Sequence, residues 1–178
     1  EIYRVVQVPA EFNFYQLHYV IQIAMGWGVA HMHEFRVKHY RISELFDEVD
    51  DQWAEGLIDS KTVIVGLTVS KGDKFIYEYD FGDSWVHEIK VEKSFETEEN
   101  VFYPTCVDGA MACPPEDCGS IPGYYRLIEI MNGKKDEEYE EMIEWLGEAF
   151  EADKFDIKMV NDIFEDVFKP KVKKKRKK

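Results

Sequence analysis

Histidine and acidic residues gather in one short segment, which reads YEYDFGDSWVHEI from Tyr77 to Ile89. Within it, Asp80 and Asp83 lie beside a glycine, and His87 follows on the same stretch. Histidine nitrogens and carboxylate oxygens are the ligands of zinc and related divalent ions, and the same groups act as general acids and bases. The segment therefore predicts a metal site, an acid–base site or a polar binding surface.

Asp80, Phe81 and Gly82 form a triplet that also carries the magnesium-binding aspartate of protein kinases. A kinase further needs a glycine-rich phosphate loop, a strand lysine and a His-Arg-Asp catalytic loop, none of which occurs in this sequence. We therefore exclude a kinase and interpret Gly82 as the residue that lets the chain turn between two strands.

A pair of histidines precedes this segment. His31 and His33 lie two residues apart in HMHEFRVKHY, and strand alternation would point both imidazoles to one face. A metal site follows if the two strands are neighbours, and zinc is then the typical ion. Its candidate ligands are His31, His33, Asp83 and His87. The alternative is that the histidines are half-buried core groups, hydrogen-bonded to the backbone or to the aspartates.

The three cysteines offer a second candidate metal site. Cys106, Cys113 and Cys118 lack the paired C-x-x-C spacing of a zinc ribbon, and a fourth ligand would have to come from elsewhere. Free structural thiols, a zinc site and a disulfide or redox role are therefore all open. Glu116 and Asp117 follow two prolines in the same loop and are the candidate catalytic residues. In a structural role they would cap the next helix.

Aromatic residues accompany these polar groups, so the region can also be interpreted as a binding surface. Its aromatic members would supply apolar contact area, and its aspartates and histidines would supply hydrogen bonds. The residues of this candidate binding surface are Trp27, His31, His33, Tyr79, Asp80, Asp83, Trp85 and His87.

Strand and helix patterns indicate which elements position these residues. IYRVVQV at 2–8 predicts a strand, and Asn13 is a helix N-cap followed by apolar residues at helical spacing up to Gly26. Segments 74–79 and 85–92 predict the two arms of a hairpin. The β-branched run TVIVGLTV at 62–69 predicts another strand. The polar segment 43–60 predicts a short helix or loop, and 106–123 predicts an ordered loop.

Two helices are predicted near the end of the chain, at 139–150 and, after the N-cap Asp156, at 157–167. Strands first and helices at both ends favour an α+β fold. We predict a mostly antiparallel sheet with a central hairpin, one N-terminal helix and a C-terminal helical pair. These elements would form a single domain over residues 1–168, followed by a basic tail at 169–178.

Charge is distributed unevenly along the chain. The last ten residues carry eight Lys or Arg, and removing them from the net charge of −14 leaves −22 on residues 1–168. An acidic body argues against broad nucleic-acid binding, whereas the tail predicts weak, non-specific contact with nucleic acid or with the acidic body itself. No apolar run is long enough to span a bilayer, so we expect a cytoplasmic protein without a membrane partner.

Three quoted segments together resemble the plasmid pRiA4b ORF-3-like family, which also includes passenger proteins of insertion elements. They are LHYVIQIAMGWGVAHMHEF, YEYDFGDSWVHEI and ACPPEDCGSIPGYYRLIEI. Two departures occur: Tyr3 stands where the family has Trp, and Ser120 stands where it has a second Gly. The resemblance implies an α+β fold and a link to plasmids or mobile elements, but it supplies no activity. Some members are labelled resolvase-like, and this sequence has no serine- or tyrosine-recombinase arrangement.

The function predicted from these observations is a small intracellular binding or adaptor module for a protein or small-molecule ligand. One alternative is a metal-dependent hydrolase, in which the His/Asp cluster holds a divalent ion and Glu116 acts as general base on a phosphodiester. Another is a DNA-associated accessory protein that uses the basic tail.

Overall fold

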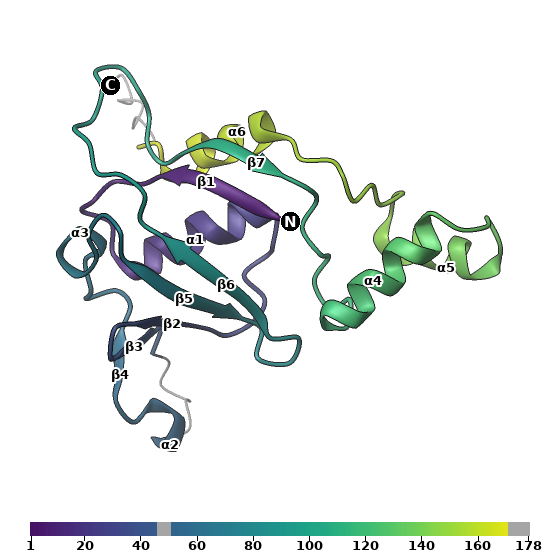
Figure 1. Ribbon diagram of the computed structural model, residues 1–178, viewed down its shortest axis with the longest axis horizontal. Helices are drawn as coiled ribbons and strands as arrows, with labels where there is room; N and C mark the ends of the chain where they lie inside the picture. The colour runs from purple at the N-terminus through teal and green to yellow at the C-terminus, as the bar shows by residue number, and fades with distance from the viewer. Residues whose placement is uncertain (46–50, 171–178) are drawn as a thin grey trace, which may run out of the picture.

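The computed structural model describes residues 1–45 and 51–170 of the chain, and Figure 1 shows the arrangement of its elements. In chain order the elements are β1 (Tyr3–Gln7), α1 (Phe14–Met25), β2 (His33–Val37), β3 (Tyr40–Ser43), α2 (Asp51–Ala54), β4 (Leu57–Asp59), α3 (Val65–Thr68), β5 (Lys74–Tyr79), β6 (Trp85–Lys90), β7 (Thr105–Ala110), α4 (Ser120–Met131), α5 (Glu137–Leu146) and α6 (Ile157–Phe168).

A five-stranded sheet in the order β4-β3-β2-β5-β6 forms the centre of the molecule. Its pairings are antiparallel except for the parallel pair β3–β4. A separate two-stranded antiparallel sheet joins β1 to β7. The α+β fold with a mostly antiparallel sheet is therefore confirmed, as is the β5–β6 hairpin, in which Tyr79 pairs with Trp85.

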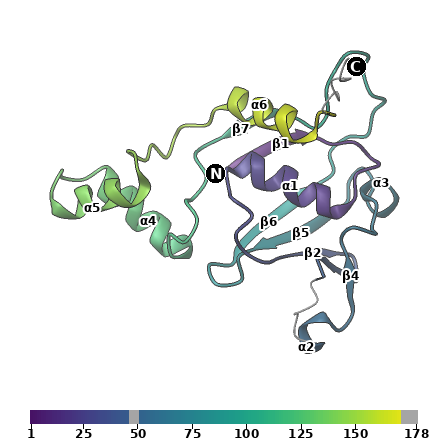
Figure 2. The same cartoon turned by 180° about the vertical axis from the view of Figure 1, so that it is seen from behind.

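Helix α1 separates two hydrophobic clusters. It begins at a capping box, in which Asn13 accepts from the Gln16 backbone N–H and Gln16 accepts from the Asn13 N–H, and it ends at Gly26 with a φ of 85°. Phe14 and Leu17 pack in the cluster on the five-stranded sheet. Farther along α1, Val20 and Ala24 pack in a cluster with Val160 and Phe164 of α6. The helix therefore joins the sheet to α6 (Figure 2).

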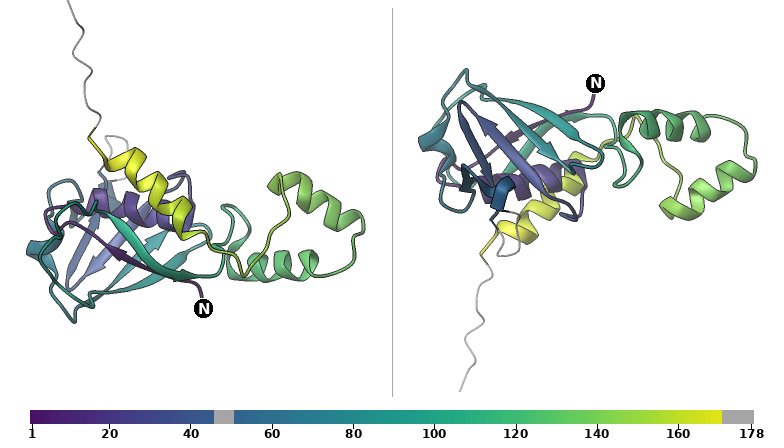
Figure 3. Two further views of the ribbon diagram at one scale, coloured as in Figure 1. Left: turned by 90° about the horizontal axis from the view of Figure 1, so that it is seen from above. Right: turned by 90° about the horizontal axis from the view of Figure 1, so that it is seen from below.

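Helices α4 and α5 form an arm that projects from one side of the body (Figure 3). Tyr124 of α4 packs in the core cluster on the sheet, but no residue of α5 is buried. The chain then returns, and α6 packs on β7 and α1. Two helices follow α4 as predicted, but α5 packs against α4 rather than against α6. The predicted inward residues Ile163 and Val167 are 38% and 54% exposed.

Two sequence predictions were wrong in element type. The run 62–69 contains the short helix α3 instead of a strand, because the Val65 and Gly66 N–H groups bond the carbonyls of Phe12 and Ala10 rather than a neighbouring strand. The predicted loop 106–123 contains most of β7 and the start of α4, because β1 supplies β7 with a pairing partner.

Two predicted segments, 43–60 and the basic tail, include residues that the structure does not describe. Segment 43–60 holds α2 and the short strand β4, but positions 46–50 lie outside the described part of the chain. Most of the basic tail, 171–178, lies outside it as well. Over the described residues, no helix combines the length and apolar character needed to cross a membrane.

Candidate functional site

The loop between β7 and α4 lies against the end of the five-stranded sheet, and backbone atoms anchor both of its ends. At the first end, the Trp27 indole N–H donates to the Pro114 carbonyl at 2.9 Å. At the other end, an Asp83 carboxylate oxygen accepts from the Gly119 N–H at 3.1 Å, and the Asp83 carbonyl accepts from the Ser120 hydroxyl. Residues 114–120, called the docking loop below, therefore bring Glu116 and Asp117 to the sheet.

Glu116 holds the middle of the docking loop. One of its oxygens accepts from the Tyr79 hydroxyl, and the other accepts from the Gly28 N–H at 3.1 Å. The Tyr79 oxygen in turn accepts from the N–H groups of Ala30 and His31, at 3.0 and 3.3 Å. Burial, followed by the Glu116 carboxylate, raises the pKa of Tyr79 well above its ordinary value. These bonds fix the Glu116 side chain, and each of its oxygens keeps a further lone pair.

His31 lies between two carboxylates. Its Nε2 atom is 3.2 Å from Oδ1 of Asp117, and its Nδ1 atom is 3.8 Å from Oδ1 of Asp80. Asp80 follows β5 with a φ of 54° and accepts from the Gly82 N–H at 3.0 Å, which fixes its side chain. Each of the three residues offers one ligand atom, and these atoms lie within 4.8 Å of one another. The three side chains are called the His31 cluster below.

The His31 cluster is open on one side. The side chain of Asp80 is 11% exposed and that of His31 28%, whereas that of Asp117 is 71% exposed. A divalent ion could be reached from solvent past Asp117 and held by one nitrogen and two oxygens.

His33 points to a different place, inside the core. Its ring stacks on that of His18 of α1 with centroids 3.6 Å apart and planes 6° apart. Both histidines are buried, at 4% and 1% exposure. The Gln22 amide donates to the Tyr77 hydroxyl at 2.9 Å, and that hydroxyl is 2.8 Å from Nδ1 of His18. Because the amide nitrogen can only donate, we assign the hydroxyl proton to the bond with Nδ1, which makes this nitrogen an acceptor in neutral imidazole.

Burial keeps this histidine pair neutral. It lowers the pKa of His18 to about 2, with a further contribution from His33, and lowers the pKa of His33 to about 4. The Nε2 atom of His33 is buried without a hydrogen-bond partner among the described residues. His33 is thus a core group, the alternative that the sequence left open for the histidines.

His87 and Trp85 share a face of β6, because they lie two residues apart in the strand. The His87 ring meets the Trp27 ring edge-on at 5.4 Å, and the Trp85 ring lies 6.3 Å from Trp27. Nδ1 of His87 is 3.0 Å from the Trp85 carbonyl, and burial lowers the pKa of His87. His87 and Asp83 therefore contact other residues than His31 does. The four predicted metal ligands do not form one group.

The aromatic members of the predicted binding surface are mostly inside the protein. Trp27, Tyr79 and Trp85 are 7%, 0% and 8% exposed. They form the wall on which the docking loop packs, and Trp27 stacks on Tyr79 with centroids 4.8 Å apart. The accessible surface beside them includes Asp117 of the His31 cluster and the exposed apolar residues Met32 and Phe81.

The cysteines are free thiols in apolar surroundings. Cys106 is buried beside α6, whereas Cys113 and Cys118 pack against the core cluster on the sheet. Burial raises the pKa of all three thiols, that of Cys118 to about 11. They do not group with His, Asp or Glu as metal ligands in the described part of the chain.

His18 and Gln22 are the polar residues of this region that sequence reasoning missed. A signal was present, because they lie four residues apart on the apolar face of α1, where polar side chains need buried partners.

Comparison with known proteins finds one protein family and two relatives that are similar to this chain. The model of the plasmid pRiA4b ORF-3-like protein family matches residues 1–159. The uncharacterized protein y4hQ of Sinorhizobium fredii is 35% identical over 150 residues, which cover 83% of this chain and 75% of that protein. The crystal structure of MM3350, a protein of unknown function from Methanosarcina mazei Go1, has a TM-score of 0.76 and 32% identity, covering 88% of both chains.

Proposed function

The chain belongs to the plasmid pRiA4b ORF-3-like family, and we propose that it acts as a binding module whose ligand is a divalent cation held by His31, Asp80 and Asp117. The relatives described above are uncharacterised and assign no activity. The observation that carries the proposal is the approach of one imidazole nitrogen and two carboxylate oxygens to within 4.8 Å of one another.

Zinc and manganese fit this ligand set. Ligand atoms at about 2.0–2.2 Å from one ion lie roughly 3–4 Å apart, so a group whose ligand atoms lie within 4.8 Å of one another would contract around it. Three protein ligands leave coordination positions for water or for an anionic group of a partner.

An ion in this position would join two parts of the protein. His31 and Asp80 flank the ends of β2 and β5, whereas Asp117 belongs to the docking loop that leads into α4. A bound ion would therefore fasten the base of the α4–α5 arm to the sheet, which supports the role of an adaptor that presents the arm when metal is bound. Hydrolysis is the less favoured function, because the hydrogen bonds of the candidate base Glu116 to the Tyr79 hydroxyl and the Gly28 N–H give it a structural role in holding the docking loop.

Calorimetric titration of metal-free protein with Zn²⁺ and Mn²⁺ tests the proposal, using protein without a histidine tag. We expect close to one ion per chain, and Asp117→Asn should weaken binding about tenfold or more because a charged ligand is lost. Asp153→Asn is the matched control, since Asp153 is an exposed aspartate outside the cluster. Absence of binding by either metal, or equal affinity in the Asp117 variant, would refute the metal site.

The basic tail supports a second, weaker contact. Eight positive charges at 169–178 favour phosphate binding, and the net charge of −22 on residues 1–168 opposes it. We infer that the tail binds DNA weakly and without sequence preference, and that this binding disappears at physiological salt. We also infer that the protein is cytoplasmic. A salt titration of full-length protein and of protein lacking 169–178 tests this. Sequence-selective binding by the truncated protein would overturn it.

A further inference from the structure

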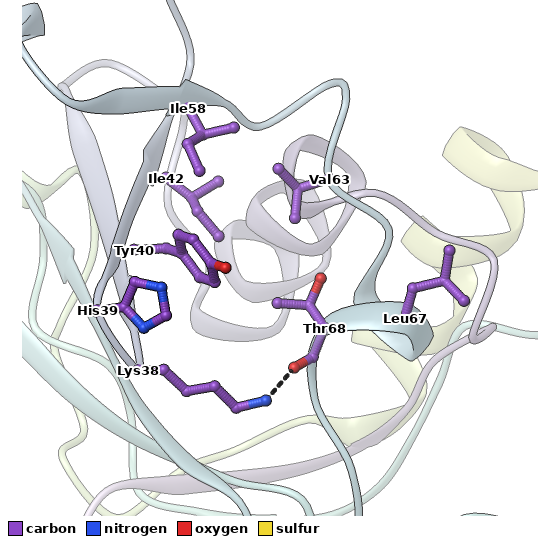
Figure 4. Close-up of a pocket in the computed structure, with 8 residues that line it drawn as sticks. All are labelled: Lys38, His39, Tyr40, Ile42, Ile58, Val63, Leu67 and Thr68. Carbon is purple, nitrogen blue, oxygen red and sulfur yellow. Dashed lines mark hydrogen bonds between the residues drawn. The ribbon is translucent and has the colours of Figure 1, made fainter.

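A pocket lies at the opposite end of β2 from His31, and Figure 4 shows its lining. Its volume of about 460 Å³ falls in the range of small-molecule sites. The lining residues are Lys38, His39, Tyr40, Ile42, Ile58, Val63, Leu67 and Thr68. They come from the β2–β3 turn, β3, β4 and the segment around α3. The pocket shares no residue with the His31 cluster.

Close packing of the α3 backbone on Ala10 fixes the position of the apolar side of the pocket. Gly66 of α3 lies so close to Ala10 that a Cβ atom on it would be 2.8 Å from the Ala10 Cβ and carbonyl oxygen. This contact holds α3 where the neighbouring Leu67 stands at the pocket with 87% of its surface exposed. Ile42 is fully buried at the pocket, and its neighbour Ile58 packs against the core cluster. The result is a firm aliphatic floor with one exposed leucine beside it.

The polar side of the pocket carries a cation. The Lys38 ammonium donates to the Thr68 carbonyl at 2.8 Å (Figure 4). It also forms an ion pair with Asp73, whose Oδ2 atom is 3.8 Å away. An ammonium has three N–H donors, so this contact leaves donors for a ligand. Tyr40, with its ring 3.9 Å from that of His39, brings a 40% exposed side chain to the same side. Aliphatic carbons and one ammonium, whose charge Asp73 partly offsets, thus face the same space.

We propose that this pocket binds a small monocarboxylate with a branched aliphatic tail. The tail would lie on Ile58, Val63 and Leu67, and the carboxylate would accept from the Lys38 ammonium. The ammonium selects the head group, because Lys38 is the only lysine or arginine among the residues that line the pocket and it keeps N–H donors for a carboxylate. The same chemistry is offered by a free branched-chain acid and by the C-terminal leucine of a peptide. The proposal is independent of the metal site.

Methyl-resolved NMR of protein labelled at Ile, Leu and Val tests both sources. The probes are 4-methylpentanoate, its neutral amide 4-methylpentanamide, the peptide Ala-Ala-Leu and that peptide with an amidated C-terminus. We expect at least one acid to shift the methyl signals of Ile58, Val63 and Leu67 and to bind about tenfold more tightly than its amide, which corresponds to roughly 1.4 kcal/mol for a charged hydrogen bond. Binding by only one acid identifies the source.

Two variants locate the interaction. Lys38→Gln should remove the preference for acid over amide, whereas Lys93→Gln, which makes the same charge change outside the pocket, should keep it. Leu67→Ser should weaken every probe without unfolding the protein, because Leu67 is almost fully exposed. Equal binding of acid and amide, a preference that survives Lys38→Gln, or no methyl shift with any probe would each overturn the proposal.

Discussion

The stacked pair of His18 and His33 predicts a specific loss of stability in mild acid. Folding buries both rings and favours their neutral forms, so their pKa values fall to about 2 and about 4 from an ordinary 6.5. The unfolded chain therefore binds protons below pH 6.5 that the native protein excludes. The contribution of each histidine is complete above pH 6.5 and is lost progressively as the pH falls below that value.

The magnitude follows from linkage. One such histidine lowers the free energy of unfolding by about 1.4 kcal/mol per pH unit below 6.5, or about 2 kcal/mol between pH 7 and pH 5. His18→Gln keeps a polar side chain that can accept from the Tyr77 hydroxyl but does not titrate. The free-energy difference between wild type and this variant should therefore shrink by about 2 kcal/mol from pH 7 to pH 5. Carboxylates elsewhere titrate alike in both proteins and cancel.

Guanidinium chloride unfolding followed by tryptophan fluorescence measures this difference at each pH. Histidine ring signals in NMR provide an independent reading, because His18 should stay neutral at pH 5 in the native protein. A difference that is constant between pH 7 and pH 5 would refute the reasoning, since it would mean that His18 titrates equally in both states.

Three further substitutions test the contacts that hold the elements in place, each by its free energy of unfolding. Tyr79→Phe should cost about 1–3 kcal/mol, because Glu116 and two backbone N–H groups lose their shared partner. The control Tyr125→Phe changes a residue that is 66% exposed, so it should cost almost nothing. Gly66→Ala should cost about 1–3 kcal/mol because its Cβ would meet Ala10, and a neutral effect would show that α3 can shift. Asp156→Ala should cost about 1 kcal/mol, since α6 loses the side chain that accepts from the Met159 N–H at 2.9 Å, and an unchanged midpoint would argue against this cap.

The elements that could be predicted from the sequence are those with local signals. Asn13 and Gly26 mark the ends of α1 by their own chemistry, and the turn after Tyr79 marks the hairpin. In contrast, α3 is decided by backbone bonds to residues 10–12, and β7 exists because β1 pairs with it. Propensity in a short window carries no information about such distant partners.

For the candidate site, too, the sequence indicated the individual residues but not the long-range contacts that bring them together. His31, Asp80 and Asp117 were each singled out, but their grouping depends on how the docking loop packs on the sheet. The expectation that His31 and His33 share a face assumed a strand through both residues. Strand β2 begins at His33, so alternation does not extend back to His31, and the two imidazoles separate into a surface cluster and a core stack.

The pairing of β1 with β7 has a consequence for the order in which the protein folds. It joins Tyr3 to Ala110, so about 100 residues of chain must be closed into a loop before this contact forms, at a high cost in chain entropy. The hairpins β2–β3 and β5–β6 close through short turns. We therefore expect the five-stranded sheet to supply the folding nucleus, and β1, β7 and α6 to assemble last and to open first as one cooperative unit during native-state hydrogen exchange.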